Sequence, residues 1–366
     1  MDTMTARPLK RPAPAPVVAD LGARPIDSGA ASTGDGADKG GLERIFDLVR
    51  EDFAAVNALI PNRLTSDVDL VEKIGTYIVE SGGKRLRPLL VLLSAKALNH
   101  GAVKDDGSDH IKLAAVIEFL HTATLLHDDV VDHSALRRGR ATANALWGNA
   151  SSVLVGDFLY SRAFQLMVEL GRMQILAILS DATNTIAEGE VHQLANIGNF
   201  ELSEAEYRET IRCKTALLFE AATHTAGELI STDPAMTEAL RRFGLHFGLA
   251  YQLVDDCMDY LGDAATMGKN VGDDLAEGKL TLPIIHALSR SNPEDKALLI
   301  NALKRGDVSA LPEVLDVLTA TGSLVYAKDA ALVESNLALQ ALAGLLPTAA
   351  REAMAELTRF CTRRLY

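Results

Sequence analysis

Apolar residues recur every three or four positions along most of the chain, which is the spacing of one face of an α-helix. This pattern covers residues 42–59, 68–79, 89–98, 111–127, 152–170, 174–194, 204–226 and 236–260, and it resumes over 282–366. The sequence contains no extended runs of alternating β-branched residues, which strands favour. Because short polar connections separate the helical segments, the sequence predicts an all-α bundle.

The first 41 residues interrupt this pattern. They are rich in Pro, Ala, Gly and Asp and show little periodicity, a composition typical of disordered segments. We therefore predict a disordered extension over residues 1–41, of unknown role, and one helical domain over residues 42–366. Charged or polar residues interrupt the apolar stretches well before about 18 residues, so no transmembrane helix is predicted. The start of the chain lacks the features of a secretory signal, although its Arg and Lys residues leave organelle targeting as an alternative, and we expect a cytoplasmic protein.

Composition narrows the class of protein. The 48% hydrophobic content is ample for one large core, and the formal net charge of -13 argues against general binding to nucleic acid. Cys213, Cys257 and Cys361 are scattered, at spacings that fit neither a disulfide framework nor a structural zinc site. Positive charge is concentrated in small clusters.

The motif DDxxD occurs twice, at residues 128–132 and 255–259, each time after a long apolar helical pattern. On a helix, the first and last aspartates of a copy lie four residues apart, so both carboxylates project from one face. One copy alone is most often a solvated acidic face. Two copies beside apolar sequence favour a site for divalent cations, because clustered like charges are costly to desolvate without compensation. Magnesium usually completes its coordination with substrate phosphates, so the motifs also indicate a phosphorylated ligand.

Two basic clusters accompany the acidic motifs. Lys84-Arg85-Leu86-Arg87 follows the pair Gly82-Gly83, and Arg137-Arg138 follows the first motif. A basic triplet alone is most often solvated surface. Here the glycines allow close approach of the backbone to a ligand, and arginine presents a planar fork that suits phosphate. Two basic clusters and two metal-binding faces would hold two diphosphates.

Taken together, the motifs resemble those of the trans-isoprenyl diphosphate synthases. The resemblance is carried by GGKRLRP at 82–88, HDDVVDHSALRRG at 127–139, KT at 214–215 and YQLVDDCMDYLGD at 251–263, followed by GK and EGKLTLP. Their order and spacing match over roughly residues 42–366, and the set is far more specific than any one motif. The resemblance implies the isoprenoid synthase bundle around a deep central cavity, and a homodimer.

The resemblance also implies roles for residues at matching motif positions. The expected magnesium ligands are Asp128, Asp132 and Asp255, supported by Asp129, Asp256 and Asp259, with three Mg²⁺ per site when diphosphate is bound. The residues expected to bind isopentenyl diphosphate are Lys84, Arg87, His121 and Arg138, and Arg85 is grouped with them as substrate-binding. The residues expected to contact the allylic diphosphate or its metals are Arg137, Lys214, Thr215, Gln252, Lys269 and Lys279. Asp128, Asp132, Asp255 and Lys214 are the expected catalytic residues.

His121 shows how position decides between two interpretations. A lone histidine in an apolar helix is more often a satisfied core residue. This one lies seven residues before Asp128, so two helical turns place both side chains on one side. We therefore predict that His121 binds substrate.

Product length is expected to depend on the helix before the first acidic motif. In the resembled family, bulky aromatic residues at this place stop elongation early, whereas Ala123 and Thr124 are small. Leu120 continues the same apolar face, and Phe164 or Met167 is the hypothetical terminal floor. The sequence most resembles the long-chain enzymes that make quinone side chains, with an octaprenyl product expected and nonaprenyl or decaprenyl products as alternatives.

Two other classes of function stay open at this stage. A class I terpene cyclase also uses an aspartate-rich helix and Mg²⁺, but it needs no isopentenyl site such as the basic cluster at 84–87. A non-catalytic partner subunit of a heteromeric synthase would tend to have degraded acidic motifs, and both copies are intact here. A long apolar product would also suit transient contact with a membrane surface during release.

Overall fold

The computed structural model describes residues 36–98, 108–196, 198–261, 271–363 and 365. The predicted all-α fold is confirmed for these residues, and residues 38–366 form one compact unit. The strands in the described part of the chain are β1 (Leu136–Arg137) and β2 (Arg140–Ala141), a short antiparallel hairpin with Leu136 opposite Ala141. Helix α1 (Gly36–Asp47) starts inside the segment predicted to be disordered, and residues 1–35 lie outside the described residues.

The helices of the N-terminal half follow the predicted segments closely. They are α2 (Arg50–Arg63), α3 (Asp69–Glu80), α4 (Leu86–Leu98), α5 (Asp109–Val131), α6 (Ala143–Trp147), α7 (Asn149–Leu170) and α8 (Met173–Ala195). The predicted helix 42–59 is divided at Leu48 and Val49, between α1 and α2.

The C-terminal half is also helical where it is described. Its helices are α9 (Glu204–Ile211), α10 (Leu217–Ile230), α11 (Pro234–Leu261), α13 (Asp273–Ala276), α14 (Leu282–Arg290), α15 (Pro293–Arg305), α16 (Leu311–Ala320), α17 (Ser323–Leu342) and α18 (Ala349–Arg363). A 3₁₀ turn covers Val308–Ala310.

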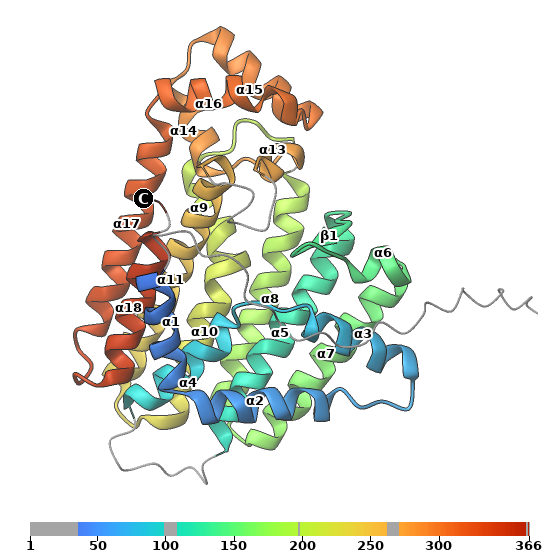
Figure 1. Ribbon diagram of the computed structural model, residues 1–366, viewed down its shortest axis with the longest axis vertical. Helices are drawn as coiled ribbons and strands as arrows, with labels where there is room; N and C mark the ends of the chain where they lie inside the picture. Colours follow the sequence, from blue (N-terminus) through green and yellow to red (C-terminus); the bar gives the residue numbers. More distant parts are fainter. Residues whose placement is uncertain (1–35, 99–107, 197, 262–270, 364, 366) are drawn as a thin grey trace, which may run out of the picture. The chain divides into compact units, whose positions relative to one another are not determined.

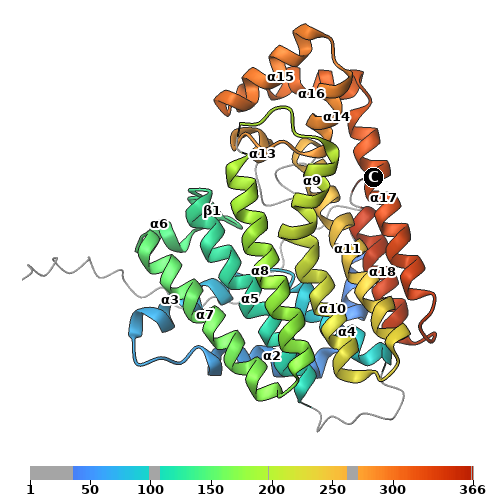
Figure 2. The same ribbon diagram turned by 180° about the vertical axis from the view of Figure 1, so that it is seen from behind.

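Helix packing brings the two acidic motifs into one bundle. Helix α5 packs against α4, α7 and α10, and α11 packs against α10 and α17. Figures 1 and 2 show α5, α7, α8, α10 and α11 as neighbouring helices, with α13 to α16 gathered at one end of the bundle. The first motif lies at the end of α5 and the second at the end of α11.

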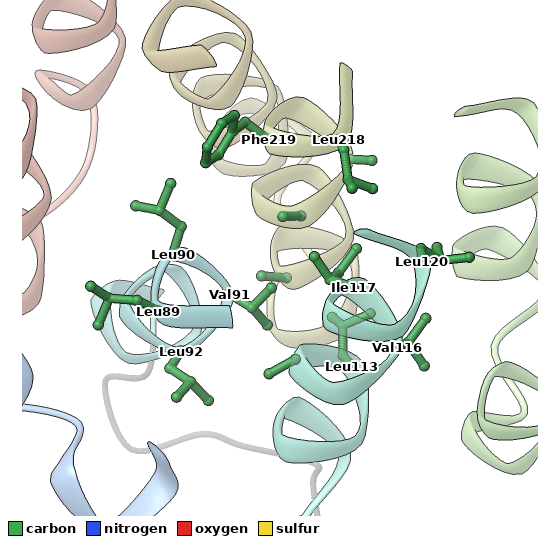
Figure 3. Packing of buried hydrophobic residues seen from close by; sticks show 14 of the residues in the cluster. Leu89, Leu90, Val91, Leu92, Leu113, Val116, Ile117, Leu120, Leu218 and Phe219 are labelled. Carbon is green, nitrogen blue, oxygen red and sulfur yellow. The ribbon is translucent and has the colours of Figure 1, made fainter. Parts of the chain in front are cut away.

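The core is centred on α4, whose residues 89–93 are at most 1% exposed. A helix that is apolar on all sides is expected in the interior of a bundle, because every face meets another helix. Figure 3 shows Val91 of α4 pointing toward Leu113 and Ile117 of α5, while Leu120 lies on the side of α5 away from α4. Leu120 therefore projects toward a different part of the interior from the α4 contact.

The predicted single helix over residues 204–226 is wrong in one respect. Ser203 and Glu206 form a capping box that starts α9, but the chain then makes a π-turn over Arg212–Ala216 before α10 begins. A π-turn adds a residue to one helical turn and is frequent at functional sites. Lys214 and Thr215, which the resemblance had marked as substrate contacts, both lie in it.

The described residues contain no single helix long and apolar enough to cross a membrane. Cys213, Cys257 and Cys361 are buried free thiols, in agreement with the predicted absence of a disulfide framework.

Candidate active site

Two residues that follow α11, Lys279 and Asp274, contact the first and the second acidic motif respectively. Asp128 and Asp129 lie in the last turn of α5, and Asp132 is its C-cap residue. The Nζ atom of Lys279, which follows α13, lies 3.7 Å from Oδ2 of Asp132. The backbone amide of Asp274 in α13 in turn donates a hydrogen bond of 3.1 Å to Oδ2 of Asp259 in the second motif. The segment after α11 therefore contacts both motifs.

Asp128 faces a mixed set of charges. Burial, with smaller contributions from Glu190 and Asp132, raises the pKa of its carboxyl to about 7, and the cations of Lys214 and Arg137 act against this shift. Burial, with smaller effects of Asp128 and Glu190, also raises the pKa of Tyr160 to about 12. A carboxylate that is costly to ionise in the absence of a metal is a suitable ligand for a cation.

Asp129 is turned toward the basic cluster that follows it. Its carboxylate is fully buried, and Oδ1 accepts hydrogen bonds from Nε of Arg137 at 2.9 Å and lies 2.7 Å from Nη2 of the same guanidinium. Its Oδ2 atom is buried without a hydrogen-bond partner. The side-chain amide of Asn144 donates to the backbone oxygens of Asp129 and Ser134, at 3.1 and 3.2 Å. The hairpin is thus fastened to the end of α5, and Arg137 is oriented by the motif itself.

The second motif is embedded more deeply. Asp256 is 4% exposed; its Oδ1 accepts a 2.7 Å hydrogen bond from Gln252, and its Oδ2 accepts one from the hydroxyl of Tyr207. Burial raises the pKa of Asp256 to about 7, although the two hydrogen bonds act in the opposite direction. The hydroxyl of Thr215 donates to Oε1 of Gln252 at 2.8 Å. Gln252 and Thr215, both predicted site residues, therefore form one hydrogen-bonded unit with the motif.

Lys214, which also lies in the π-turn, forms hydrogen bonds with helix α8. Its Nζ donates to Oε2 of Glu190 at 2.9 Å and to Oε1 of Gln193 at 3.1 Å, both on α8. Neither Glu190 nor Gln193 is among the site residues predicted from the sequence. Because Lys214 and Thr215 are adjacent yet engage α8 and α11 respectively, the π-turn joins the surroundings of the two motifs.

Both glycines before the first basic cluster have positive φ, and Gly83 also packs closely against Arg138. Gly82 and Gly83 have φ of 78° and 137°, and the guanidinium of Arg138 donates to the backbone oxygen of Gly82. A Cβ atom at Gly83 would lie 2.4 Å from Nη1 of Arg138. Arg85 and Arg138 also have positive φ, at 43° and 53°, which is costly for residues with side chains. Two strained loops therefore meet where the resemblance implied that isopentenyl diphosphate binds.

Arg85 has partners within the protein. Its guanidinium donates to the side chain of Asn57 and, at 3.2 Å, to the backbone oxygen of Val79, and its Nε lies 3.7 Å from Glu118. These contacts favour a role in bracing the loop over the direct substrate contact expected from the sequence. Lys84, the preceding residue, is exposed.

Arg87 and His121 form a half-buried pair. The guanidinium of Arg87 lies 4.1 Å from the ring centre of Phe219, and its Nη1 lies 3.1 Å from Nε2 of His121. Arginine can only donate, so Nε2 of His121 accepts. Burial, followed by the charges of Arg87 and Arg138, holds the pKa of His121 well below its usual value, and burial lowers that of Arg87 to about 10. His121 is therefore a neutral imidazole beside a cation.

Glu118 belongs to the same group, although the sequence analysis did not identify it. It lies one helical turn before His121 and, with His121, Arg137, Arg138, Ser81 and Gly82, it lines a pocket between α3, α5 and the hairpin. Burial raises the pKa of Glu118, whereas Arg85, Arg87 and Arg138 lower it, and Oε2 is buried without a partner. Its spacing from His121 was the signal that would have revealed it.

The predicted chain-length residues separate into two groups. Ala123 and Leu120 are buried, and half-buried Thr124 donates its hydroxyl to the backbone oxygen of His121 at 2.8 Å. Phe164 is 37% exposed, whereas Met167 on the same helix is 1% exposed. The interior position of Met167 favours it over Phe164 as a terminal floor.

The carboxylates of the two motifs suit magnesium, which takes only part of its ligands from the protein. In the described part of the chain, no three Asp, Glu, His or Cys side chains lie close enough to hold an ion by themselves. The carboxylates come from two helix ends, and Asp129 retains an unpartnered buried oxygen. Magnesium keeps waters and takes substrate phosphate oxygens, so this arrangement fits it. Lys269, a predicted contact, lies outside the described residues.

Comparison with known sequences identifies the family. A model of the polyprenyl synthetase family matches residues 68–318. The octaprenyl diphosphate synthase of Escherichia coli (strain K12) is 47% identical over 324 residues, which cover 88% of this chain and 99% of that protein. The all-trans-nonaprenyl-diphosphate synthase (geranyl-diphosphate specific) of Rhodobacter capsulatus is 46% identical over 317 residues, covering 87% of this chain and 96% of that protein.

Solved structures agree with this. The crystal structure of a decaprenyl diphosphate synthase from Rhodobacter capsulatus matches with a TM-score of 0.83 at 42% identity, covering 88% of this chain and 99% of that one. A polyprenyl synthase from Caulobacter crescentus CB15, complexed with calcium and isoprenyl diphosphate, matches with a TM-score of 0.80 at 44% identity, covering 88% and 97%. The fold, the paired acidic motifs and the family match together establish that the chain belongs to the polyprenyl synthetase family.

Proposed function

We propose that this chain is a long-chain all-trans polyprenyl diphosphate synthase. It condenses isopentenyl diphosphate repeatedly onto an allylic diphosphate such as farnesyl diphosphate and makes octaprenyl diphosphate for a quinone side chain. The observation that carries the proposal is the presence of two cationic groups around the ends of α5 and α11. One contains Arg87, Arg138 and neutral His121; the other contains Lys214 and Lys279.

Magnesium is the proposed cofactor. Asp128, Asp132 and Asp255 would hold it, and the number of ions, three per site with bound diphosphate, is part of the proposal. When bound, the metal stabilises negative charge that develops on a departing diphosphate. The calcium in the related Caulobacter crescentus complex supports a divalent site in this family.

Different side chains of this protein would bind the two substrates. Lys214, held by Glu190 and Gln193, presents a fixed ammonium near Asp128, where the allylic diphosphate departs. Arg87 and Arg138 would bind the diphosphate of isopentenyl diphosphate. Neutral His121 accepts from Arg87 through Nε2, so its proton is on Nδ1, where it serves as a further donor.

The reaction requires that the two substrates are positioned and that water is excluded. It does not require a nucleophilic side chain. Ionisation of the allylic carbon–oxygen bond leaves a delocalised cation, the double bond of isopentenyl diphosphate attacks it, and loss of one proton restores an allylic diphosphate. Water must be kept from the cation. The buried apolar side chains of Leu120 and Ala123, on the helix that carries the first motif, suit that requirement.

Other product lengths remain the main alternative within this function. The relatives are named for octaprenyl, nonaprenyl and decaprenyl products, so the octaprenyl length rests on the similarity to the Escherichia coli enzyme. A terpene cyclase is disfavoured by the isopentenyl-binding cluster around Arg87, and a non-catalytic subunit is disfavoured by two intact acidic motifs.

The proposed setting is a cytoplasmic homodimer that touches a membrane surface transiently when the product leaves. The dimer is supported by large apolar side chains that are exposed on neighbouring helices α7 and α8: Leu154, Val168, Met173, Val191 and Leu194. Light scattering of the purified chain tests the dimer, and sedimentation with vesicles tests the membrane contact. A monomer, or no product-dependent vesicle binding, would remove the respective part of the proposal.

The function is tested by incubating the purified chain with farnesyl diphosphate, labelled isopentenyl diphosphate and Mg²⁺. Incorporation of label into an apolar product is expected. Consumption of farnesyl diphosphate without incorporation of label indicates a cyclase. A folded protein that consumes neither substrate indicates a partner subunit.

A further inference from the structure

Tyr207 of α9 lies against the second acidic motif although no sequence motif marks it. Its hydroxyl donates to Oδ2 of Asp256, while Gln252 donates to Oδ1 at 2.7 Å. Tyr207 is 3% exposed and Asp256 is 4% exposed. Protein donors therefore hold both oxygens of this carboxylate in the interior.

The hydrogen bonds continue from Asp256 to the π-turn. Thr215 donates to Gln252 at 2.8 Å, and Gln252 donates to Asp256, so both donors point the same way along the series. Tyr207 donates to Asp256 from the opposite side. The carboxylate is thus the common acceptor of a series that begins next to Lys214.

The position of Tyr207 is itself well fixed. At the start of α9, Ser203 forms a capping box, and Glu204 accepts a 2.8 Å hydrogen bond from Tyr326 of α17. Arg208 of the same helix donates to Glu334 of α17 at 3.2 Å. A phenol without a partner would be costly at so buried a place, so the contact with Asp256 is strongly preferred.

We propose that Tyr207 is a positioning residue for the second acidic motif. By holding Asp256 in place, its hydroxyl fixes the last turns of α11 and so the direction of the neighbouring Asp255 carboxylate toward the metal-bound allylic diphosphate. Groups that orient metal ligands without contacting the metal usually contribute strongly to affinity. The inference rests on the proposed prenyl transfer and deepens it by assigning a further residue to the allylic half of the site.

The test compares Tyr207→Phe with the matched control Tyr326→Phe. Each variant loses one hydroxyl that contacts either Asp256 or the start of α9, so the control reports on general loosening of α9. Calorimetry with inorganic diphosphate and Mg²⁺ is the first measurement. Tyr207→Phe is expected to weaken binding by about 10- to 100-fold, and Tyr326→Phe by less than about twofold.

A second measurement separates positioning from general damage. In the incorporation assay, Tyr207→Phe is expected to raise the Mg²⁺ concentration for half-maximal rate while leaving the KM for isopentenyl diphosphate unchanged. Equal shifts in Tyr207→Phe and Tyr326→Phe, or wild-type diphosphate binding in Tyr207→Phe, would overturn the inference. A wild-type chain that binds diphosphate with Mg²⁺ but never incorporates label would overturn the proposed function, and the calorimetric comparison would still decide the role of Tyr207.

Asp256→Asn makes the test independent of how Tyr207→Phe folds. If Tyr207 acts through Asp256, the double variant should bind diphosphate about as weakly as Asp256→Asn alone, because the two losses are not additive. Full additivity would contradict the inference. If Tyr207→Phe fails to fold, Asp256→Asn is tested alone. Diphosphate binding by Asp256→Asn that equals the wild-type value would then contradict the inference.

Discussion

Nζ of Lys279 lies 3.7 Å from Oδ2 of Asp132, so the segment that follows the second acidic motif reaches the C-cap of the helix that carries the first. Lys279 also pairs with Glu277, and its backbone amide donates to the backbone oxygen of Asp274 at 2.8 Å. A cation fixed in this way can neutralise diphosphate charge between the two motifs.

Replacement of Lys279 by methionine tests this contact. The apolar stem is retained and the charge is lost, so the KM for the allylic diphosphate should rise about tenfold while that for isopentenyl diphosphate stays the same. Steady-state kinetics with each substrate varied in turn measures this. Lys304→Met is the matched control, because Lys304 lies on α15 over the ring of Phe200. An equal change in both KM values would contradict the assignment of Lys279 to one substrate.

Removal of a metal-motif carboxylate should abolish most turnover. Asp128→Ala and Asp255→Ala are each expected to lower kcat by about 100-fold or more, since each removes a ligand of the ion that stabilises the leaving group. Circular dichroism should show the helices unchanged. Asp181→Ala, an exposed carboxylate on α8, serves as control. Full activity in either motif variant would exclude the assigned role.

The pH dependence follows from Asp128, whose pKa burial raises to about 7. Below this value the carboxyl must lose a proton to bind a cation, so the Mg²⁺ concentration for half-maximal rate should fall as pH rises toward about 7 and level off above it. For the metal-free chain the sign for stability is opposite. A raised folded pKa favours the protonated form, so this contribution is present below about pH 4 and is lost as pH rises through 7. Asp128→Asn should weaken both pH dependences and leave the part that comes from Asp256, whose pKa is also raised by burial to about 7.

The glycine pair at 82–83 offers a test of packing at the isopentenyl site. Gly83→Ala would place a Cβ atom 2.4 Å from Arg138, whereas a Cβ atom at Gly82 meets nothing within 4 Å. Both positions have positive φ, so Gly82→Ala controls for backbone strain. Gly83→Ala should raise the KM for isopentenyl diphosphate about tenfold more than Gly82→Ala does. Equal effects would show that strain alone is responsible.

Product length should respond to the face of α5 before the first motif. A phenylalanine at Ala123 fills buried space, so Ala123→Phe is expected to give short prenyl products. Met167→Ala is expected to lengthen the product, and Phe164→Ala to leave it unchanged because Phe164 is largely on the surface. Mass spectrometry of the dephosphorylated products measures all three. Unchanged long products from Ala123→Phe would show that this face does not line the channel.

The helical fold and the acidic motifs were accessible from sequence because both depend on local spacing. The 3.6-residue period predicted α4, α5, α7, α8 and α11 within a few residues. The π-turn at Arg212–Ala216 was not accessible, since its residues have no periodicity of their own and tertiary contacts decide it. Tyr207 was missed for the same reason: it lies seven positions before Lys214, and the π-turn breaks the helical register between them. The contacts of Arg85 with Asn57 and Glu118 could not be predicted, because no sequence motif relates these residues to Arg85.

On the proposed function, this chain joins isopentenyl units to an allylic primer until a long chain is complete. The most direct measurement is the mass of the dephosphorylated product formed by the purified chain from farnesyl diphosphate, isopentenyl diphosphate and Mg²⁺. A single dominant prenyl alcohol of octaprenyl length is predicted. Products that stop at a short prenyl chain would contradict the proposed long-chain product, and absence of any elongated product from folded, metal-supplied protein would contradict the proposed function itself.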